Sequence, residues 1–244
     1  MKNNHNLSIL LSVIGIVLFV LPGITAASAA ATPSAVPSGA VFTQTNSATG
    51  NSIQAFYRAQ NGILTYAGDY STHGMGTGAG LGDQGALALS NGWLFAVDAG
   101  SNQISVFKVH GASLKFTDIV SSNGVSPLSV TVHGDWVYVV NAGNSTTPGN
   151  IAGFRVTSSG MLHLIAGSIQ ALSSSSSVGP AQISFNPKGT VLVVTEKTTS
   201  NIDTYVVNSL GVAGPATITA SDGTTPFGFA FDPTGQLVVS NAAS

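Results

Sequence analysis

One pattern of apolar and polar positions recurs along this chain, and residues 136–154 show it most clearly. Residues 136–140 form a run of aromatic and β-branched side chains, which suits a strand on a half-buried sheet. Gly, Asn, Ser, Thr and Pro then dominate up to residue 150, which is typical of a loop, and an apolar pattern resumes at Ile151 and Phe154. The same strand–loop–strand unit occurs at 41–56, 94–107 and 191–205, and it begins again at Leu237.

Two sequence markers give this unit a period of about 50 residues. An Ile-x-x-aromatic motif marks the second strand of each unit at Ile53/Phe56, Ile104/Phe107, Ile151/Phe154 and Ile202/Tyr205. A proline precedes a further short strand at Pro127, Pro180 and Pro226. Four short strands in each period are typical of a β-propeller blade. A β-sandwich is the alternative, but a sandwich does not require the same strand to recur at this interval.

The sequence therefore predicts an all-β protein, a β-propeller of four-stranded antiparallel blades. No helical periodicity competes after residue 30. The predicted domain covers 40–244, with three strands in the first blade, four in each of the next three and two in the last. The blades are expected at about 41–70, 84–120, 127–170, 180–220 and 226–244.

The first 29 residues have the layout of a secretory signal peptide. An apolar run at 7–20 is broken by Leu21-Pro22-Gly23, and the small residues Ala27-Ser28-Ala29 form a cleavage site. A retained membrane anchor is the alternative, although the run is shorter than the roughly 20 residues that a span needs. We expect a linker at 30–39, a secreted or extracytoplasmic protein (cell surface or periplasm), and no membrane span in the mature chain.

Composition excludes several classes of function. Only 7% of the residues are charged, and 7 Lys+Arg stand against 9 Asp+Glu, so no basic surface is available for nucleic acid. Cysteine is absent, which excludes disulfides and thiolate metal sites. No closely spaced set of histidines and acids suggests a metal site, and we expect neither a metal nor another cofactor.

The segments VYVVNAG with IAGFRV, FNPKGTVLVV and FDPTGQLVVSN resemble the lactonase-type seven-bladed propeller family. This family includes propeller 6-phosphogluconolactonases and carboxymuconate cyclases, and the resemblance extends from Val41 to the end. It implies seven blades, of which this chain supplies about four and a half. We therefore expect a truncated propeller that is cut inside a blade, with open, apolar strand edges that invite association with other chains.

The loops that follow the second strands, and those between blades, should share one face of such a propeller, where ligands are expected. Glu196, the only glutamate, ends a second strand at the position where another repeat has Asp98. Either carboxylate could act as a general base, and these are the two catalytic candidates. The alternative is that each carboxylate ends its strand and pairs with a neighbour or with water. The ligand-binding candidates in these loops are His73, Asp83, Asn102, Asn141, Asn144, Lys197 and Asn201.

Two functions from different classes remain open. The resemblance implies His, Glu and Arg side chains above the channel, often with a Pro-His pair before the innermost strand. Here those pairs read Pro127-Leu128, Pro180-Ala181 and Pro226-Phe227, and Arg58 and Arg155 fall on third strands. This departure favours a non-catalytic scaffold at the cell surface that binds an unknown small molecule, polymer or protein. The alternative is a lactonase-type hydrolase of carboxylic ester (lactone) bonds, or a carboxymuconate cyclase-like enzyme, with part of its site in the missing blades.

Overall fold

A computed structural model describes residues 37–242 of the chain. The predicted signal peptide at 1–29 and the first part of the predicted linker lie outside the described residues. The described residues form 18 strands and contain no helix. Accordingly, this part of the chain has no helix long and apolar enough to cross a membrane.

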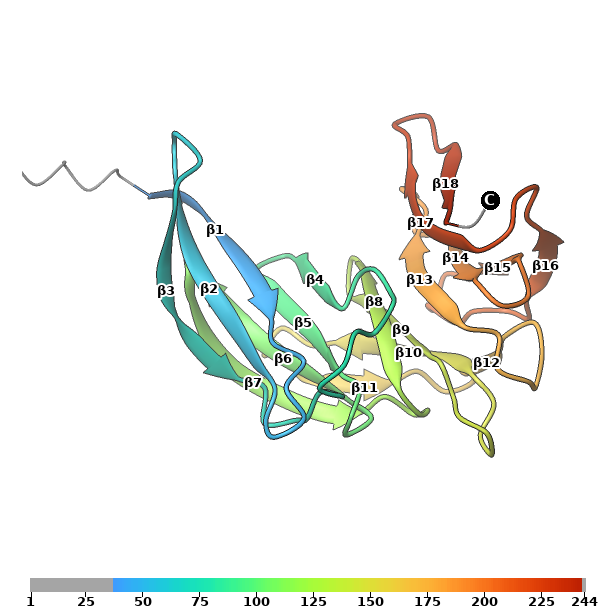
Figure 1. Cartoon of the computed structure of the whole chain (residues 1–244), viewed down its shortest axis with the longest axis horizontal. Coiled ribbons are helices and arrows are strands. Elements are labelled where there is room, and N and C mark those ends of the chain that lie inside the picture. The colour runs from blue at the N-terminus through green and yellow to red at the C-terminus, as the bar shows by residue number, and fades with distance from the viewer. Residues whose placement is uncertain (1–36, 243–244) are drawn as a thin grey trace, which may run out of the picture. The chain divides into compact units, whose positions relative to one another are not determined.

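The strands assemble into five antiparallel sheets that follow one another in chain order (Figure 1). The first sheet contains β1 (Pro37–Gln44), β2 (Ser52–Ala59) and β3 (Leu64–Ser71). The second sheet contains β4 (Leu87–Ser90), β5 (Trp93–Asp98), β6 (Gln103–His110) and β7 (Ser113–Ser121).

The third sheet contains β8 (Pro127–His133), β9 (Trp136–Asn141), β10 (Asn150–Val156), β11 (Leu162–Leu164) and the short β12 (Gln170–Ala171). The fourth contains β13 (Pro180–Phe185), β14 (Val191–Glu196), β15 (Asn201–Val206) and β16 (Thr217–Ala220). The fifth contains β17 (Pro226–Phe231) and β18 (Leu237–Asn241). The predicted fold class is thereby confirmed: the protein is all-β, with sheets in the up-and-down order of propeller blades.

Two details differ from the sequence prediction. Strand β1 begins at Pro37, inside the stretch that we assigned to a linker, because it pairs with the full length of β2 as far as Ala59. The third sheet was predicted with four strands, but the last of these is divided into β11 and β12. Between them, the Ser168 hydroxyl donates to the carbonyl oxygen of Gly153 at 2.9 Å and accepts from its N–H at 3.0 Å. This side chain occupies the backbone groups of β10 that a continuous strand would have used.

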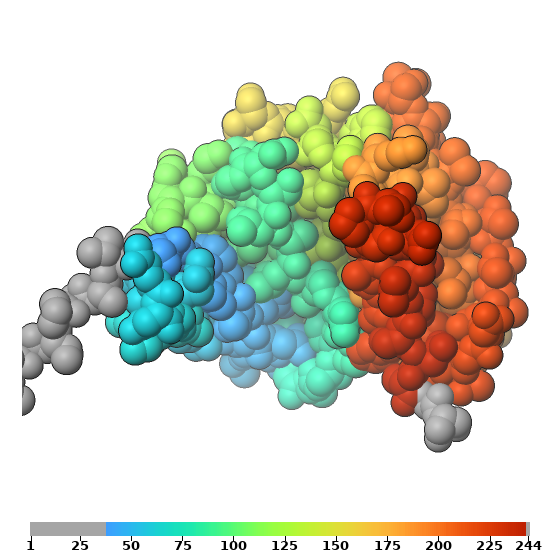
Figure 2. All heavy atoms as spheres, turned by 90° about the horizontal axis from the view of Figure 1, so that it is seen from above, coloured from blue at the N-terminus to red at the C-terminus, as the bar shows by residue number. Residues whose placement is uncertain are grey.

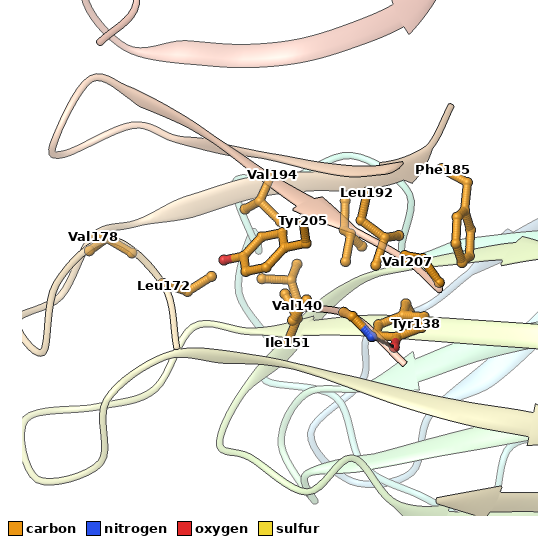
Figure 3. Close-up of a cluster of buried hydrophobic side chains, with 12 residues drawn as sticks. Tyr138, Val140, Ile151, Leu172, Val178, Phe185, Leu192, Val194, Tyr205 and Val207 are labelled. Atoms are coloured by element: carbon orange, nitrogen blue, oxygen red, sulfur yellow. Dashed lines mark hydrogen bonds between the residues drawn. The ribbon is translucent and has the colours of Figure 1, made fainter. Parts of the chain in front are cut away.

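The hydrophobic core is divided among the joints between successive sheets. One cluster joins the first and second sheets, another joins the second and third, and the largest joins the third and fourth. Figure 3 shows this largest cluster, in which Tyr138 and Val140 of β9 face Leu192 and Val194 of β14. The second strand of each complete sheet packs against neighbours on both faces, so β9 and β14 read as continuous apolar runs rather than as alternating ones.

The sheets do not close into a ring through strand pairing. Within residues 37–242, neither the first sheet nor the fifth pairs with the other through backbone hydrogen bonds. The first strands of the second to fifth sheets are instead neighbours in space, in the chain order β4, β8, β13 and β17. These innermost strands form the wall on which the candidate site is built.

Candidate functional site

Asp98, one predicted catalytic residue, is completely buried at the end of β5. Its Oδ1 accepts hydrogen bonds from Asn51 Nδ2 at 2.8 Å and from Thr72 Oγ1 at 2.6 Å, and its Oδ2 accepts one from the Ser105 hydroxyl. Burial raises the pKa of Asp98, and these three donors lower it again in part. The carboxyl group therefore ties the first sheet to the second.

Glu196, the other predicted catalytic residue, has an equivalent place at the end of β14 and is also completely buried. It accepts hydrogen bonds from the Ser173 N–H at 3.0 Å, from the Ser173 hydroxyl, and from Thr199 Oγ1 at 2.5 Å. Ser173 follows the last strand of the third sheet, so Glu196 ties the third sheet to the fourth.

Asn141, at the end of β9, completes the series. Its Nδ2 donates to the carbonyl oxygen of Ser122 at 3.1 Å and to Asn150 Oδ1 at 2.8 Å. A buried polar residue thus ends the second strand of each complete sheet and bonds to the segment that follows the preceding sheet. A role in joining blades accounts for the burial and partners of Asp98 and Glu196, and their catalytic role stays a prediction.

The Gly-rich connection between β3 and β4 forms one wall of the candidate site. It is fastened to the β1–β2 loop, where Gly76 N–H donates to Ser47 O at 2.8 Å and the Asn46 Oδ1 accepts from Thr77 N–H at 2.9 Å. The two segments are so close that a Cβ on Gly76 would come within 2.2 Å of the Asn46 carbonyl carbon. Only glycine allows this approach, which explains the glycine at position 76.

The end of this connection crosses the innermost strands of later sheets. Gln84 N–H donates to Ala181 O of β13 at 2.8 Å, and the Gly85 carbonyl accepts from Val130 N–H of β8 at 2.8 Å. The Gln84 side chain also lies against Gly228 of β17, where a Cβ would come within 2.6 Å of its amide. Figure 2 shows this blue-green part of the chain beside the red fifth sheet. Asp83 is thereby held above the innermost strands.

A cavity of about 650 Å³ opens between this connection and the β1–β2 loop. The residues that line it come from the end of β1, from the β1–β2 loop and from residues 78–86, and they include Gln44, Asn46 and Asp83. Its size is within the range of about 300–1,000 Å³ that holds small-molecule ligands.

Two residues of the cavity lining each carry a buried acceptor oxygen that has no hydrogen-bond partner among the described residues: Asp83 Oδ2 and Gln44 Oε1. The amide nitrogen of Gln44 is already used, since it donates to Val97 O at 2.6 Å. Unpaired buried acceptors are rare in native proteins because each one loses its hydrogen bonds to water. A water molecule or a ligand group that reached either oxygen would supply the missing donor.

The positive charge of Lys197 acts on the Asp83 carboxyl group. Burial raises the pKa of Asp83 to about 6, and Lys197 lowers it only in part. Burial likewise lowers the pKa of Lys197, which Asp83 partly offsets. The Lys197 ammonium donates to Gly82 O and lies 5.4 Å from the ring centroid of Phe227. Asp83 and Lys197, both predicted as ligand-binding residues, are thus brought into one site.

The other predicted ligand-binding residues lie elsewhere and shape loops. The His73 ring packs on Phe116, with 4.4 Å between ring centroids, and no hydrogen bond joins it to Asp83. The other three accept or donate within their own turns or to a neighbouring loop: Asn102 Oδ1 from Ser126 N–H at 2.7 Å, Asn144 Oδ1 from Thr147 N–H at 2.8 Å, and Asn201 Nδ2 to Ser173 Oγ at 3.3 Å. Gln44 is the residue that sequence reasoning missed, because nothing in its repeat position distinguishes it.

The arrangement offers a carboxyl group able to exchange a proton near neutral pH, a cation beside it and a partly polar cavity. General acid–base catalysis needs such a carboxyl group, and a neighbouring cation stabilises the negative charge that develops in the reaction. Across residues 37–242, no three His, Asp or Glu side chains gather as metal ligands.

Several solved structures share the fold. A 6-phosphogluconolactonase candidate from Bacteroides uniformis is 13% identical with a TM-score of 0.64, and the match covers 84% of this chain and 63% of that one. A protein from Lactobacillus plantarum is 20% identical with a TM-score of 0.64, covering 78% and 57%. The periplasmic gluconolactonase of Pseudomonas aeruginosa is 18% identical with a TM-score of 0.63, covering 83% and 60%. The chain therefore spans about three fifths of the length of these structures, and at these identities the likeness establishes the fold.

Among curated protein sequences, none matches this chain significantly. A family model does: the one described as lactonase, seven-bladed β-propeller, matches residues 49–176, which is more than half of the chain. The matched segment includes the whole connection that carries Asp83 and the second and third sheets. The chain belongs to the lactonase family of seven-bladed β-propellers.

Proposed function

We propose that the cavity beside Asp83 hydrolyses a lactone. The observation that carries this proposal is the place of Asp83 on the lining of a cavity of about 650 Å³, with a carboxyl pKa that burial raises to about 6 and a buried Oδ2 that has no hydrogen-bond partner in residues 37–242. Membership of the lactonase family supports ring-opening of a cyclic ester at the level of reaction class.

The reaction adds water across the ester bond. Ionised Asp83 takes a proton from a water molecule, and the water oxygen forms a bond to the lactone carbonyl carbon. The carbonyl electron pair moves to its oxygen, where the Lys197 ammonium stabilises the negative charge. The carbonyl then re-forms, the bond to the ring oxygen breaks, and the proton on Asp83 passes to that oxygen. The product is an open-chain hydroxy acid.

Gln44 suits a substrate that carries hydroxyl groups. Its amide nitrogen is held by Val97, so the orientation of the side chain is fixed, and its unpartnered Oε1 is available only as an acceptor. A hydroxyl group is the matching donor. A polyhydroxylated lactone of the sugar-acid type therefore fits better than an aliphatic one.

The test is lactone turnover by the full-length protein, followed by release of acid from glucono-δ-lactone and from δ-valerolactone. We expect Asp83→Asn to lower kcat by about 10²–10⁴-fold, the usual contribution of a general base. Because the base must be ionised, kcat/KM of the unaltered protein should rise with pH through an apparent pKa near 6. The exposed acid Asp222 provides the matched control, and Asp222→Asn should leave both values unchanged.

Two outcomes would contradict the proposal. Full activity in folded Asp83→Asn protein would remove Asp83 as the base. A well-folded, full-length protein without turnover of either lactone would instead favour the non-catalytic scaffold.

A further inference from the structure

A second cavity, of about 440 Å³, lies at the opposite ends of the strands from Asp83. Three tight turns line it: the β8–β9 turn at 133–136, the β13–β14 turn at 188–190 and the start of the β15–β16 turn at 207–209. In antiparallel sheets these turns lie at one end of the strands, whereas the β14–β15 loop with Lys197 lies at the other. The cavity, called here the turn-face groove, is thus separate from the site proposed for hydrolysis.

Charged side chains without partners gather in the turn-face groove. Arg155 and Lys188 are two of only 7 Lys and Arg in the chain, and both are exposed on its lining together with Asp135. The side chains of these three residues make no hydrogen bond or ion pair with any group in residues 37–242. Asn208 Oδ1 accepts from the N–H groups of Leu210 and Val212, which leaves the amide N–H groups of Asn208 as donors.

An aromatic wall stands beside these charges. Trp136 pairs with Arg155 across β9 and β10, and it lines the groove while half-buried. Its indole is fixed on one side by the β15–β16 turn, since a Cβ on Gly211 would come within 2.6 Å of the indole nitrogen. A fixed aromatic wall of this kind suits the C–H face of a pyranose ring, because both surfaces are apolar and flat.

The groove continues into a neighbouring cavity of about 470 Å³ between the second and third sheets. The two cavities share Gly134, Asp135 and Arg155, and the second is lined by Trp93, which begins β5 as Trp136 begins β9. Each cavity thus combines one tryptophan with the same arginine, and beside the second cavity the Lys108 ammonium also lies 4.2 Å from the centroid of the Trp93 ring. Two adjoining cavities that share Arg155 suit a linear polymer of more than one sugar unit.

We propose that the turn-face groove binds an acidic polysaccharide through a uronic acid unit. The Arg155 guanidinium matches a carboxylate with two parallel N–H donors, and Lys188 adds a second positive charge. The Asp135 carboxylate accepts hydrogen bonds from sugar hydroxyls. An anion without hydroxyl groups offers no such donor, so the groove favours a sugar acid. The Trp136 indole packs against the C–H face of the sugar ring, and the amide of Asn208 donates to a further hydroxyl.

Binding is tested on the full-length protein with trigalacturonate as the probe, by isothermal titration calorimetry. We expect saturable binding that weakens as salt is added, because the contact is between exposed charges. Arg155→Gln and Lys188→Gln should each weaken it by about 10- to 100-fold, which is the usual loss for a hydrogen-bonded charge. Lys115→Gln removes an exposed lysine on β7 outside the groove and should bind as the unaltered protein does.

Fluorescence locates the ligand, because the chain has only 2 tryptophans. In Trp93→Phe protein, trigalacturonate should change the emission of Trp136 with the midpoint that calorimetry gives for the same variant. Unaltered affinity in Arg155→Gln, equal affinity for the fully methyl-esterified trisaccharide, or no binding at all would each overturn the proposal. Binding that Asp83→Asn abolishes would also overturn it, since the ligand would then occupy the other cavity. Loss of lactone turnover alone in Asp83→Asn leaves this proposal standing.

Discussion

The hydroxyl of Tyr138 donates a hydrogen bond to the carbonyl oxygen of Gly211 at 2.7 Å. The same hydroxyl accepts from the N–H of Ala213 at 2.9 Å. Tyr138 belongs to β9 of the third sheet, whereas Gly211 and Ala213 belong to the β15–β16 turn of the fourth. One completely buried side chain thus fixes the distance and register between two successive sheets (Figure 3).

Tyr138→Phe should therefore lower the free energy of unfolding by about 1–3 kcal/mol, because a buried N–H and a buried carbonyl lose their partner while the apolar ring remains. The measurement is the urea midpoint of the full-length protein. Tyr57→Phe is the matched control, since Tyr57 is exposed and its hydroxyl makes no hydrogen bond within the described residues. Equal midpoints for the two variants would contradict the structural role of the Tyr138 hydroxyl.

Asp98→Ala separates a joining role from a catalytic one. It leaves the donors of Asn51, Thr72 and Ser105 without their acceptor in a buried place, so we expect a loss of about 3 kcal/mol of stability. The lactone kcat per folded molecule should stay within about twofold, provided that turnover is measured well below the unfolding temperature. A large loss of kcat with unchanged stability would instead support the predicted catalytic role of Asp98.

The strands could be predicted from the sequence because their pattern is local. In β9 and β14, a run of β-branched and aromatic residues is bounded by turn residues, and each strand lies where that pattern predicts it. The 50-residue period also predicted how the strands are grouped into sheets, because each repeat must build the same four-stranded unit. The divided strand β11–β12 was missed, since it depends on one serine hydroxyl that takes the backbone groups of Gly153.

The site was predicted only as separate residues. Asp83 and Lys197 were both placed in loops, but their proximity depends on how the 72–86 connection crosses β8 and β13, which no local pattern records. Lys197 and its acceptor Gly82 are 115 residues apart in the sequence. Glu196 was singled out as the only glutamate, but it occupies the same position in its sheet as Asp98 and Asn141 do in theirs. A polar residue that recurs at one position from blade to blade is explained by its role in joining blades, whereas Asp83 has no counterpart in the other repeats.

Asp203 should make stability depend on pH. Burial and the neighbouring Glu196 raise the pKa of Asp203 to about 7, from 3.8 when the group is free in solution. Between these values the folded protein keeps a proton that the unfolded chain has lost, so the free energy of unfolding falls as pH rises from about 4 to about 7. We expect Asp203→Asn to remove a part of this fall on the order of 1–3 kcal/mol, since an amide cannot ionise.

The measurement for Asp203 is the urea midpoint at pH 5 and at pH 7.5. Asp222→Asn, on the surface, should show the pH dependence of the unaltered protein. Asp83 also has a raised pKa and contributes in the same direction, so a smaller slope rather than a flat profile is expected for Asp203→Asn. An unchanged slope would mean that Asp203 is ionised in the folded protein at neutral pH.

Gly160 and Gly62 give a test of the joint between the second and third sheets, because they share one backbone conformation in different surroundings. Their φ angles are +87° and +85°, so an alanine is strained to a similar degree at either position. A Cβ on Gly160 would come within 2.4 Å of the Trp93 ring, whereas a Cβ on Gly62 would meet nothing within 4 Å. Gly160→Ala should therefore lower the urea midpoint further than Gly62→Ala, by about 1–3 kcal/mol for the displacement of a packed ring. Trp93 emission should shift in Gly160→Ala and stay unchanged in Gly62→Ala, and equal losses of stability with equal spectra would show that Trp93 is not held by the neighbouring sheet.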